Sequence, residues 1–219
     1  DTTTGKHGHE SVLTPFRNGE ADILIGTQMI VKGHDFPNVT LVAALAADMS
    51  LYAGDYRSSE RTFELLMQAS GRAGRAEKAG EVVIQTYNPE EYSIQAVAGQ
   101  DAEYFYENEL AFRRLMKYPP YSQMAAILIL SEEENEAKTL SEKLAENIHS
   151  VCGDAVTLIG PSKAGLSRAK DRYRYVLYVK SMDEEAMACV REIAEEANRR
   201  VVNQKTCSVQ YDRDPVNGY

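Results

Sequence analysis

Hydrophobic positions up to residue 89 alternate between short apolar runs and one amphipathic segment. The runs are rich in Ile, Leu, Val and Ala, which predicts strands buried on both faces of a parallel sheet. They lie at 23–25, 39–45 and 81–86. Before the last run, Phe63, Leu66 and Met67 recur at helical spacing, and Ser58 or Ser59 is placed to cap that helix. The pattern therefore predicts an α/β unit.

From residue 122 onward the pattern is that of a second unit. Apolar extended runs predict strands at 123–130, 156–159, 173–180 and 206–211. Amphipathic runs predict helices at 133–150 and 183–202. The order βαββαβ predicts an antiparallel sheet with both helices on one face. A helical connector precedes it and ends at the YPPY segment, because proline cannot continue a helix. The predicted domains are therefore 1–89, 90–121 and 122–219.

Composition narrows the class of protein. The chain has 219 residues and 43% are hydrophobic, which is enough for two compact units. Its net charge of −9 argues against a general nucleic-acid coat, so any DNA contact must be local. No apolar run approaches the length of a membrane span. The three cysteines are scattered and odd in number, which argues against disulfides and structural zinc and favours a reducing cytoplasm.

The segment QASGRAGR at 68–75 is the main candidate for chemistry. Arg72 and Arg75 lie about one turn apart at the end of the predicted helix, so their guanidinium groups can point together out of the packed body. Arginine is permanently charged and binds phosphate oxygens bidentately, so this pair suits a polyphosphate. The alternative is a glycine-rich turn whose arginines are solvated.

A second candidate is the segment GTQMIVKGHDFP at 26–37. It follows the first apolar run, and the turn after a strand is where parallel α/β sheets bind ligands. The Thr27 hydroxyl and nearby backbone amides can bind a phosphate without steric conflict. Asp35 can orient one of the arginines or bind a ribose, or it is simply a turn residue before the proline.

One basic stretch stands out in this acidic chain. It consists of Lys163, Arg168, Lys170, Arg172 and Arg174. Tyrosines alternate with arginines at 172–175, which puts like residues on the same strand face. A basic strand beside a flexible loop containing Gly165 can bind DNA phosphate or an acidic peptide tail. The alternative is a solvated charged face.

Together, these segments resemble a known family. The pieces are GTQMIVKGHDFPNVTLV at 26–42, DYRSSER at 55–61, QASGRAGR at 68–75, GEVVIQT at 80–86, RRLMKYPPY at 113–121 and DRDP at 212–215. In this order they are similar to motifs V and VI and to the following region of the PriA-type replication-restart helicases (primosomal protein N′) of superfamily 2. The resemblance spans nearly the whole chain. It implies part of a RecA-like parallel-sheet helicase lobe, followed by a small α+β domain of βαββαβ order.

The resemblance also implies roles for individual residues. Arg72 and Arg75 would complete an ATP site as catalytic residues, with Gln68 orienting them. Gly33 and Asp35 would belong to the same site and connect it to a DNA contact. The residues implied to lie near the DNA backbone are Thr27 and Gln28.

The family activity implied is ATP-dependent 3′-to-5′ DNA unwinding at stalled or branched replication forks. Its cofactor would be ATP with Mg²⁺, but this chain has no GxxxxGK[ST] phosphate loop, so the fragment alone is expected to be inactive. Zinc is expected only elsewhere in the parent protein. The implied partners are single-stranded and forked DNA, the acidic tail of the single-stranded DNA-binding protein, and primosome loader proteins, all in the bacterial cytoplasm. Two alternatives are a non-catalytic scaffold that binds DNA or protein, and another superfamily 2 translocase acting on branched DNA.

Overall fold

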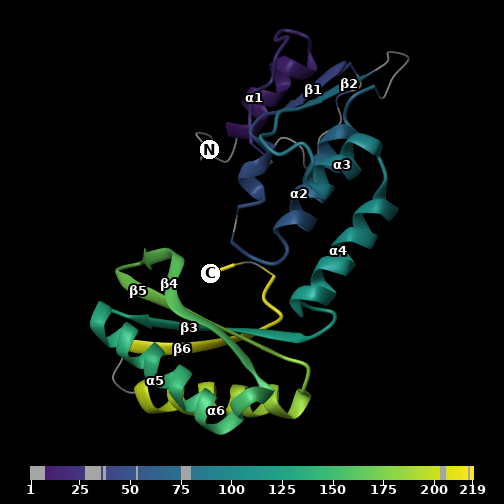
Figure 1. Ribbon diagram of the computed structural model, residues 1–219. Helices are drawn as coiled ribbons and strands as arrows, with labels where there is room; N and C mark the ends of the chain where they lie inside the picture. The colour runs from purple at the N-terminus through teal and green to yellow at the C-terminus, as the bar shows by residue number, and fades with distance from the viewer. Residues whose placement is uncertain are drawn as a thin grey trace. The chain divides into compact units, whose positions relative to one another are not determined.

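A computed structural model of the protein describes residues 8–27, 36, 38–52, 54–74, 80–202, 206–216 and 218–219 (Figure 1). The chain divides into two compact units. Unit 1 consists of Asp1–Tyr52 and Ser58–Tyr106, and unit 2 consists of Ala53–Arg57 and Glu107–Tyr219. The second division falls inside helix α4 (Ala102–Met116). No helix among the described residues is long and apolar enough to cross a membrane.

Unit 1 contains a parallel pair of strands, as predicted. Its elements are α1 (Gly8–Arg17), β1 (Leu41–Ala44), the 3₁₀ helix η2 (Ala47–Ser50), α2 (Ser58–Ser70), β2 (Glu81–Ile84), α3 (Tyr92–Gly99) and the start of α4. Strand β1 pairs with β2 from Leu41 opposite Glu81 to Ala44 opposite Ile84. Both strands are shorter than the apolar runs that predicted them.

The strand predicted at 23–25 is wrong. Residues 23–27 have no regular secondary structure, and the side chains of Ile23 and Ile25 are 77% and 87% exposed. A strand needs a neighbour for its N–H and C=O groups. Among the described residues of unit 1, β1 and β2 pair only with each other. Apolar composition therefore did not suffice to form a strand here.

Helix α2 provides the core of unit 1. Its Phe63 and Leu66 are buried and Met67 packs against them, which confirms the predicted stripe. The ring of Phe63 stacks on Phe105 of α4 with centroids 4.1 Å apart. The predicted connector is two helices, α3 and α4, because the chain turns through a left-handed residue at Gln100 (φ 51°).

Unit 2 has the predicted βαββαβ order. Its elements are β3 (Gln123–Ser131), α5 (Glu134–Cys152), the 3₁₀ helix η3 (Gly153–Ala155), β4 (Thr157–Ala169), β5 (Arg172–Ser181), α6 (Glu184–Val202) and β6 (Cys207–Arg213). The sheet is antiparallel with strand order β4-β5-β3-β6. Helices α5 and α6 cover one side of it, called here the helix face (Figure 1). The main core lies there, and we call the other side the open face.

The flexible loop predicted around Gly165 is wrong. Strand β4 continues through it to Ala169 and pairs with β5, with two irregularities in register. Lys170 and Asp171 form the connection, both with positive φ (50° and 59°). This is the geometry of a two-residue type I′ hairpin, whose twist matches that of the strands. The basic stretch is therefore built on a hairpin.

Candidate functional site

The GRAG segment forms a compact turn at the end of α2. Backbone N–H groups of Gly71 and Arg72 donate to Met67 and Ala69 carbonyls at 3.1 and 3.0 Å. The Gly74 N–H donates to the Val39 carbonyl at 3.1 Å, just before β1, and Gly74 has φ 70°. The turn is therefore fixed at both ends, to its own helix and to the chain that enters the sheet.

The predicted motor residues are described only in part. Arg72 is half-buried within the turn, while Gln68 is exposed one turn earlier in α2, so both come from the same helix end. Thr27 is exposed at the end of the irregular stretch 23–27. The remaining members, which lie outside the described residues, are Gln28, Gly33, Asp35 and Arg75. Their roles stay predictions.

A buried carboxylate at the carboxyl ends of β1 and β2 was not singled out as a site residue. Asp48 of η2 is 4% exposed. It accepts hydrogen bonds from the Thr86 hydroxyl at 2.5 Å and from the Tyr87 N–H at 2.8 Å. These two bonds, the first above all, lower the pKa of Asp48 below its usual value. No local sequence pattern marks Asp48 as a buried carboxylate, because its partners lie 38 and 39 residues away in the chain.

We expect Asp48→Asn to lower the thermal unfolding midpoint by a few degrees at neutral pH. Because folding lowers the pKa of Asp48, its stabilisation is complete above the carboxyl's unfolded pKa and is lost as the pH falls through the folded pKa. The difference from wild type should therefore disappear in acid, as followed by thermal melts across a pH series. The control is Asp22→Asn, at an exposed position. A pH-independent difference would contradict this role of the Asp48 charge.

The five basic residues do not form one surface, in contrast to the single patch expected. Lys163 and Arg168 pair in register with Tyr175 and Tyr173, which belong to the core of the helix face. The Lys163 ammonium lies 2.5 Å from Glu134 of α5. This ion pair raises the pKa of Lys163 and lowers that of Glu134. These two basic residues are therefore on the helix side of the hairpin.

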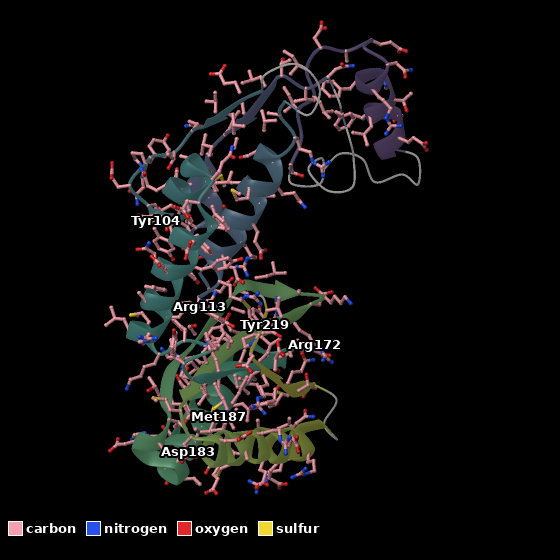
Figure 2. All side chains as sticks on the ribbon, turned by 90° about the vertical axis from the view of Figure 1, so that its right-hand side faces the viewer. Tyr104, Arg113, Arg172, Asp183, Met187 and Tyr219 are labelled. Carbon is pink, nitrogen blue, oxygen red and sulfur yellow. The ribbon has the colours of Figure 1, made fainter. Side chains whose placement is uncertain are left out.

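Arg172 and Arg174 point the other way because side chains alternate along β5. Val176 and Tyr178, two and four residues beyond Arg174, pack on the open face. The Arg174 guanidinium donates to the Leu166 carbonyl at 3.2 Å. Figure 2 shows Arg172 on the side of the sheet opposite Met187 of α6. Lys170 is exposed in the hairpin turn between the two faces.

Tyr219 occupies the open face beside these arginines (Figure 2). Its N–H donates to the Tyr178 hydroxyl at 2.9 Å, and its hydroxyl donates to Asp212 at 2.6 Å. Its carbonyl accepts from the Gly165 N–H at 2.8 Å. Burial, together with the bond to Asp212, raises the pKa of Tyr219 to about 12. The open face is therefore partly covered by the end of this chain.

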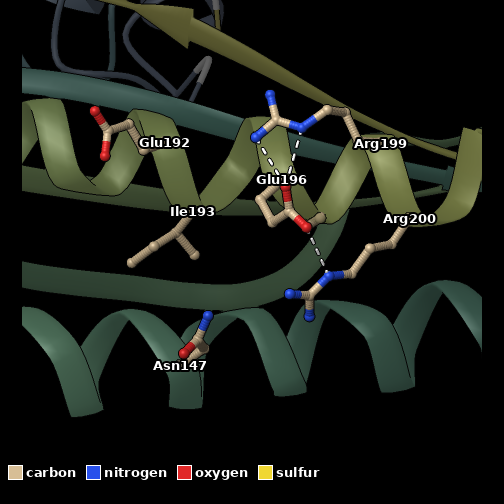
Figure 3. Close-up of a pocket in the computed structure, with 7 residues that line it drawn as sticks. Asn147, Glu192, Ile193, Glu196, Arg199 and Arg200 are labelled. Atoms are coloured by element: carbon tan, nitrogen blue, oxygen red, sulfur yellow. Dashed lines mark hydrogen bonds and ion pairs between the residues drawn. The ribbon is translucent and has the colours of Figure 1, made fainter.

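A shallow groove of about 330 Å³ lies between α5 and α6, on their outer side (Figure 3). Three of its charged side chains interact, since Glu196 accepts from Arg199 and Arg200 at 3.0 Å each. Glu192 also lines the groove, so two acidic and two basic side chains leave it without net charge, and we assign no ligand to it. No group of three or more metal-binding side chains occurs among the described residues.

Comparison with known proteins identifies both parts of the chain. The helicase conserved C-terminal domain family matches residues 1–77, and the primosomal protein N C-terminal domain family matches residues 114–216. Replication restart protein PriA of Bacillus subtilis is 46% identical over 215 residues, covering 98% of this chain and 27% of that protein. PriA of Synechocystis is 42% identical over 82% of this chain and 22% of its own length. PriA of Chlamydia trachomatis is 33% identical over 99% of this chain and 28% of its own length.

Among solved structures, the designed protein Foldit4 aligns with 42% of this chain and 94% of its own at 13% identity. The TM-score is 0.33, too low to indicate a common fold. The relatives named PriA are much longer, since the chain spans about a quarter of the length of each. Two matching domain families in sequence order, and close identity along nearly the whole chain, lead to one assignment: the chain belongs to the PriA family of replication restart proteins.

Proposed function

We propose that this chain acts as the second motor lobe and C-terminal domain of an ATP-dependent 3′-to-5′ DNA helicase. In this proposal the helicase recognises stalled or branched replication forks and restarts replication. The observation that carries the proposal is the GRAG turn, which presents Arg72 from a helix end whose backbone is tied to the start of β1. A fixed arginine at such a place can stabilise charge on a phosphoryl group during transfer.

The residues of the turn suit a nucleoside triphosphate. Arg72 and Arg75 offer guanidinium forks for phosphate oxygens, and Gln68 one turn earlier can hold them in place. We propose that Gly33 and Asp35 complete this chain's share of the site. ATP with Mg²⁺ supplies the phosphoryl group whose transfer to water drives the motor. A phosphate loop and magnesium ligands would come from another lobe of the full-length protein, so the isolated chain is inactive in this proposal. Zinc would be bound elsewhere in that protein.

DNA and protein partners are assigned to separate surfaces. Thr27 and Gln28 are proposed to contact the backbone of single-stranded DNA. Arg172 and Arg174 on the open face are proposed to bind forked DNA or the acidic tail of the single-stranded DNA-binding protein, while Lys163, Arg168 and Lys170 contribute from the hairpin. Primosome loader proteins would be further partners. All of these meet in the bacterial cytoplasm.

Replacement of Arg172 and Arg174 by alanine is expected to weaken binding of forked DNA about tenfold at low salt. Each lost phosphate contact should reduce the slope of log affinity against log salt by about one. The measurement is fluorescence anisotropy of labelled DNA, or of an acidic peptide, at several salt concentrations. The comparison variant is Lys163→Ala with Arg168→Ala, which removes the same charge from the other face and should weaken binding less.

If the slope of log affinity against log salt is unchanged for both ligands in the Arg172 and Arg174 variant, these two arginines are solvated charges that bind neither ligand. A larger loss of affinity in the Lys163 and Arg168 variant would indicate that the ligand binds on the helix face. If the Arg172 and Arg174 variant loses all binding while an Arg72 variant keeps normal ATP turnover, the chain acts as a non-catalytic scaffold instead.

A further inference from the structure

Three cations without an acidic partner among the described residues lie at the end of α4. They are Arg114 in the last turn of the helix, Lys117 just after it, and Lys180 in β5. We call them the cation cluster, and all three belong to unit 2. No ion pair in the described part of the chain includes any of them. Their charge therefore remains open to an anion from outside the chain.

The sequence of α4 explains why Arg114 has no acidic neighbour. Side chains on a helix surface meet those three or four positions away. The residues so placed before Arg114 are Leu110 and Ala111, which carry no charge. The adjacent Arg113 instead has Glu109 four positions earlier, and its guanidinium lies 2.6 Å from that carboxylate. Two neighbouring arginines thus differ, since Arg113 is neutralised and Arg114 is not.

A fixed turn holds Lys117 where α4 ends. Lys117 has φ 51°, and its N–H donates to the Arg114 carbonyl at 3.3 Å. Its own carbonyl accepts from the Ser122 hydroxyl at 2.6 Å. The N–H of Tyr118 donates to the Arg113 carbonyl at 2.8 Å before the chain enters β3 (Figure 1). The backbone that carries Lys117 is therefore held on both sides.

Arg114 is positioned by an aromatic ring instead of by a carboxylate. Its guanidinium lies 4.8 Å from the centroid of the Tyr121 ring and donates to the Tyr121 hydroxyl at 3.2 Å. A ring attracts a cation through its quadrupole but has no net charge. The guanidinium has five N–H donors, so one bond to a hydroxyl leaves others for a ligand. Arg114 is thus held in place with its charge intact.

Lys180 is held in the same way. Its ammonium lies 4.2 Å from the centroid of the Tyr118 ring and donates to the Met116 carbonyl at 2.9 Å. The Tyr118 ring is fixed in turn, because it stacks on Tyr56 with centroids 5.3 Å apart. Burial, and after it the like charge of Lys117, lowers the pKa of Lys180. The two lysines therefore repel each other, and an anion bound to both would relieve that repulsion.

The end of α4 does not by itself account for the cation cluster. A helix C-terminus carries about −0.5 of an elementary charge and so favours a cation. Lys180 satisfies this preference, since it donates to a carbonyl of the last turn. Three cations exceed the charge of the helix end by about 2.5 elementary charges. This excess is enough for about two singly charged phosphates of a nucleic-acid backbone.

We infer that the cation cluster is a binding site for phosphates of single-stranded DNA, with Tyr118 and Tyr121 as positioning residues for its cations. The inference rests on the proposed function, which supplies DNA as the anion. Arginine binds phosphate oxygens bidentately and lysine acts as a point charge. Cations interleaved with aromatic rings are typical of surfaces that bind single strands. Lys180 lies six residues beyond Arg174 in β5, about 20 Å away, so this site is separate from the hairpin arginines.

The test is Arg114→Gln with Lys117→Gln in the full-length protein. Binding of a labelled oligothymidylate is followed by fluorescence anisotropy at several salt concentrations. We expect the affinity at low salt to fall about tenfold. The slope of log affinity against log salt should decrease by about 1.4, since each phosphate contact to a single strand contributes about 0.7. Both side chains are exposed, so the thermal melt should match that of wild type.

The matched control is Arg199→Gln with Arg200→Gln on α6. It removes the same charge, but from two arginines that both donate to Glu196. Its affinity should stay within about twofold of wild type, and its slope should not change. Equal losses in the control and in the Arg114 and Lys117 variant would overturn the inference, because net charge alone would then explain them.

Tyr121→Leu tests the positioning role. It keeps every cation but removes the ring that holds Arg114, so affinity should fall about threefold, the size of an exposed cation–π contact. Tyr121→Phe keeps the ring and should bind the oligothymidylate as wild type does. Equal binding by the Leu and Phe variants would exclude a role for the ring.

Wild-type affinity and slope in the folded Arg114 and Lys117 variant would overturn the inference. So would a loss of binding to an acidic peptide but not to oligothymidylate, because the cluster would then bind carboxylates. If the double variant does not fold, Arg114→Gln alone should show about half the change in slope. An unchanged slope there would also count against the site.

Failure of the inference is distinguishable from failure of the proposed function. A wild-type protein that binds no DNA contradicts the proposed function itself. If the protein binds DNA and the Arg172 and Arg174 variant weakens that binding, while the Arg114 and Lys117 variant matches wild type, the proposed function holds and only this site is wrong.

Discussion

Arg72→Ala in the full-length protein is expected to lower DNA-stimulated ATP hydrolysis by at least about a hundredfold. Arginines directed at a transferring phosphoryl group contribute on this scale because they stabilise charge that develops in the transition state. Arg75→Ala should have a similar effect. The fold should change little, because the GRAG turn is held by backbone hydrogen bonds from Gly71, Arg72 and Gly74 that do not involve these side chains.

The measurement is steady-state phosphate release with and without single-stranded DNA, together with a thermal melt of each variant. Arg72→Lys should also be impaired, because lysine keeps the charge but loses the bidentate fork. Arg17→Ala, an exposed arginine at the end of α1, is the control and should turn over normally. The isolated chain, which is expected not to hydrolyse ATP, serves as the negative control. Near-normal turnover in both Arg72→Ala and Arg75→Ala would eliminate the catalytic role of the pair.

Glu109→Ala is expected to destabilise unit 2 by about 3–5 kcal/mol. Glu109 is 3% exposed, and its carboxylate lies 2.6 Å from Arg113, whose side chain is 12% exposed. Removal of the acid leaves the guanidinium in a mostly buried place without its nearest countercharge. The Arg113 guanidinium also lies 5.3 Å from the Tyr56 ring centroid, so this cation–π contact should weaken in the same variant.

The measurement is urea unfolding of wild type and variant, followed by circular dichroism. The control is Glu142→Ala, which breaks another i,i+4 pair in unit 2, with Lys138. There the two atoms are 3.9 Å apart and the side chains are 51% and 57% exposed, so the pair should contribute less than about 1 kcal/mol. Equal losses in the free energy of unfolding of the two variants would show that burial does not make the Glu109–Arg113 pair contribute more than the exposed Glu142–Lys138 pair.

Much of the fold follows from hydrophobic spacing. Phe63 and Leu66 predicted the buried side of α2, and the amphipathic run at 133–150 predicted α5, in which Ala137, Leu144 and Ile148 are buried. The order of strands and helices in unit 2 was also predictable from the sequence. Each element buries one face, so its hydrophobic residues recur at the spacing of a strand or of a helix. The motifs around residues 26–42 and 68–75 indicated the family before any geometry was known, and the comparisons confirmed it.

Other features depend on partners far away in the chain. Ile23 and Ile25 look like a strand, but a strand forms only where another one pairs with it. The stretch around Gly165 looks like a loop, yet Lys163 and Arg168 on either side of it pair with β5 and make it part of a hairpin. The hydrogen bonds of Asp48 come from residues about 38 positions away. Hydrophobic periodicity and secondary-structure propensity depend only on residues that are close in sequence, so they cannot predict contacts between distant residues.

The sequence by itself thus determined the element order of unit 2 and the family, because these depend on local spacing and on motif residues. It also singled out Arg72 and Arg75, whose motor role stays a prediction. Only the tertiary structure decided that the basic residues of the hairpin divide between two faces, since register assigns each side chain to a side. It alone placed Tyr56 on Tyr118, 62 positions later in the chain, because stacking of two rings requires the fold to bring them together.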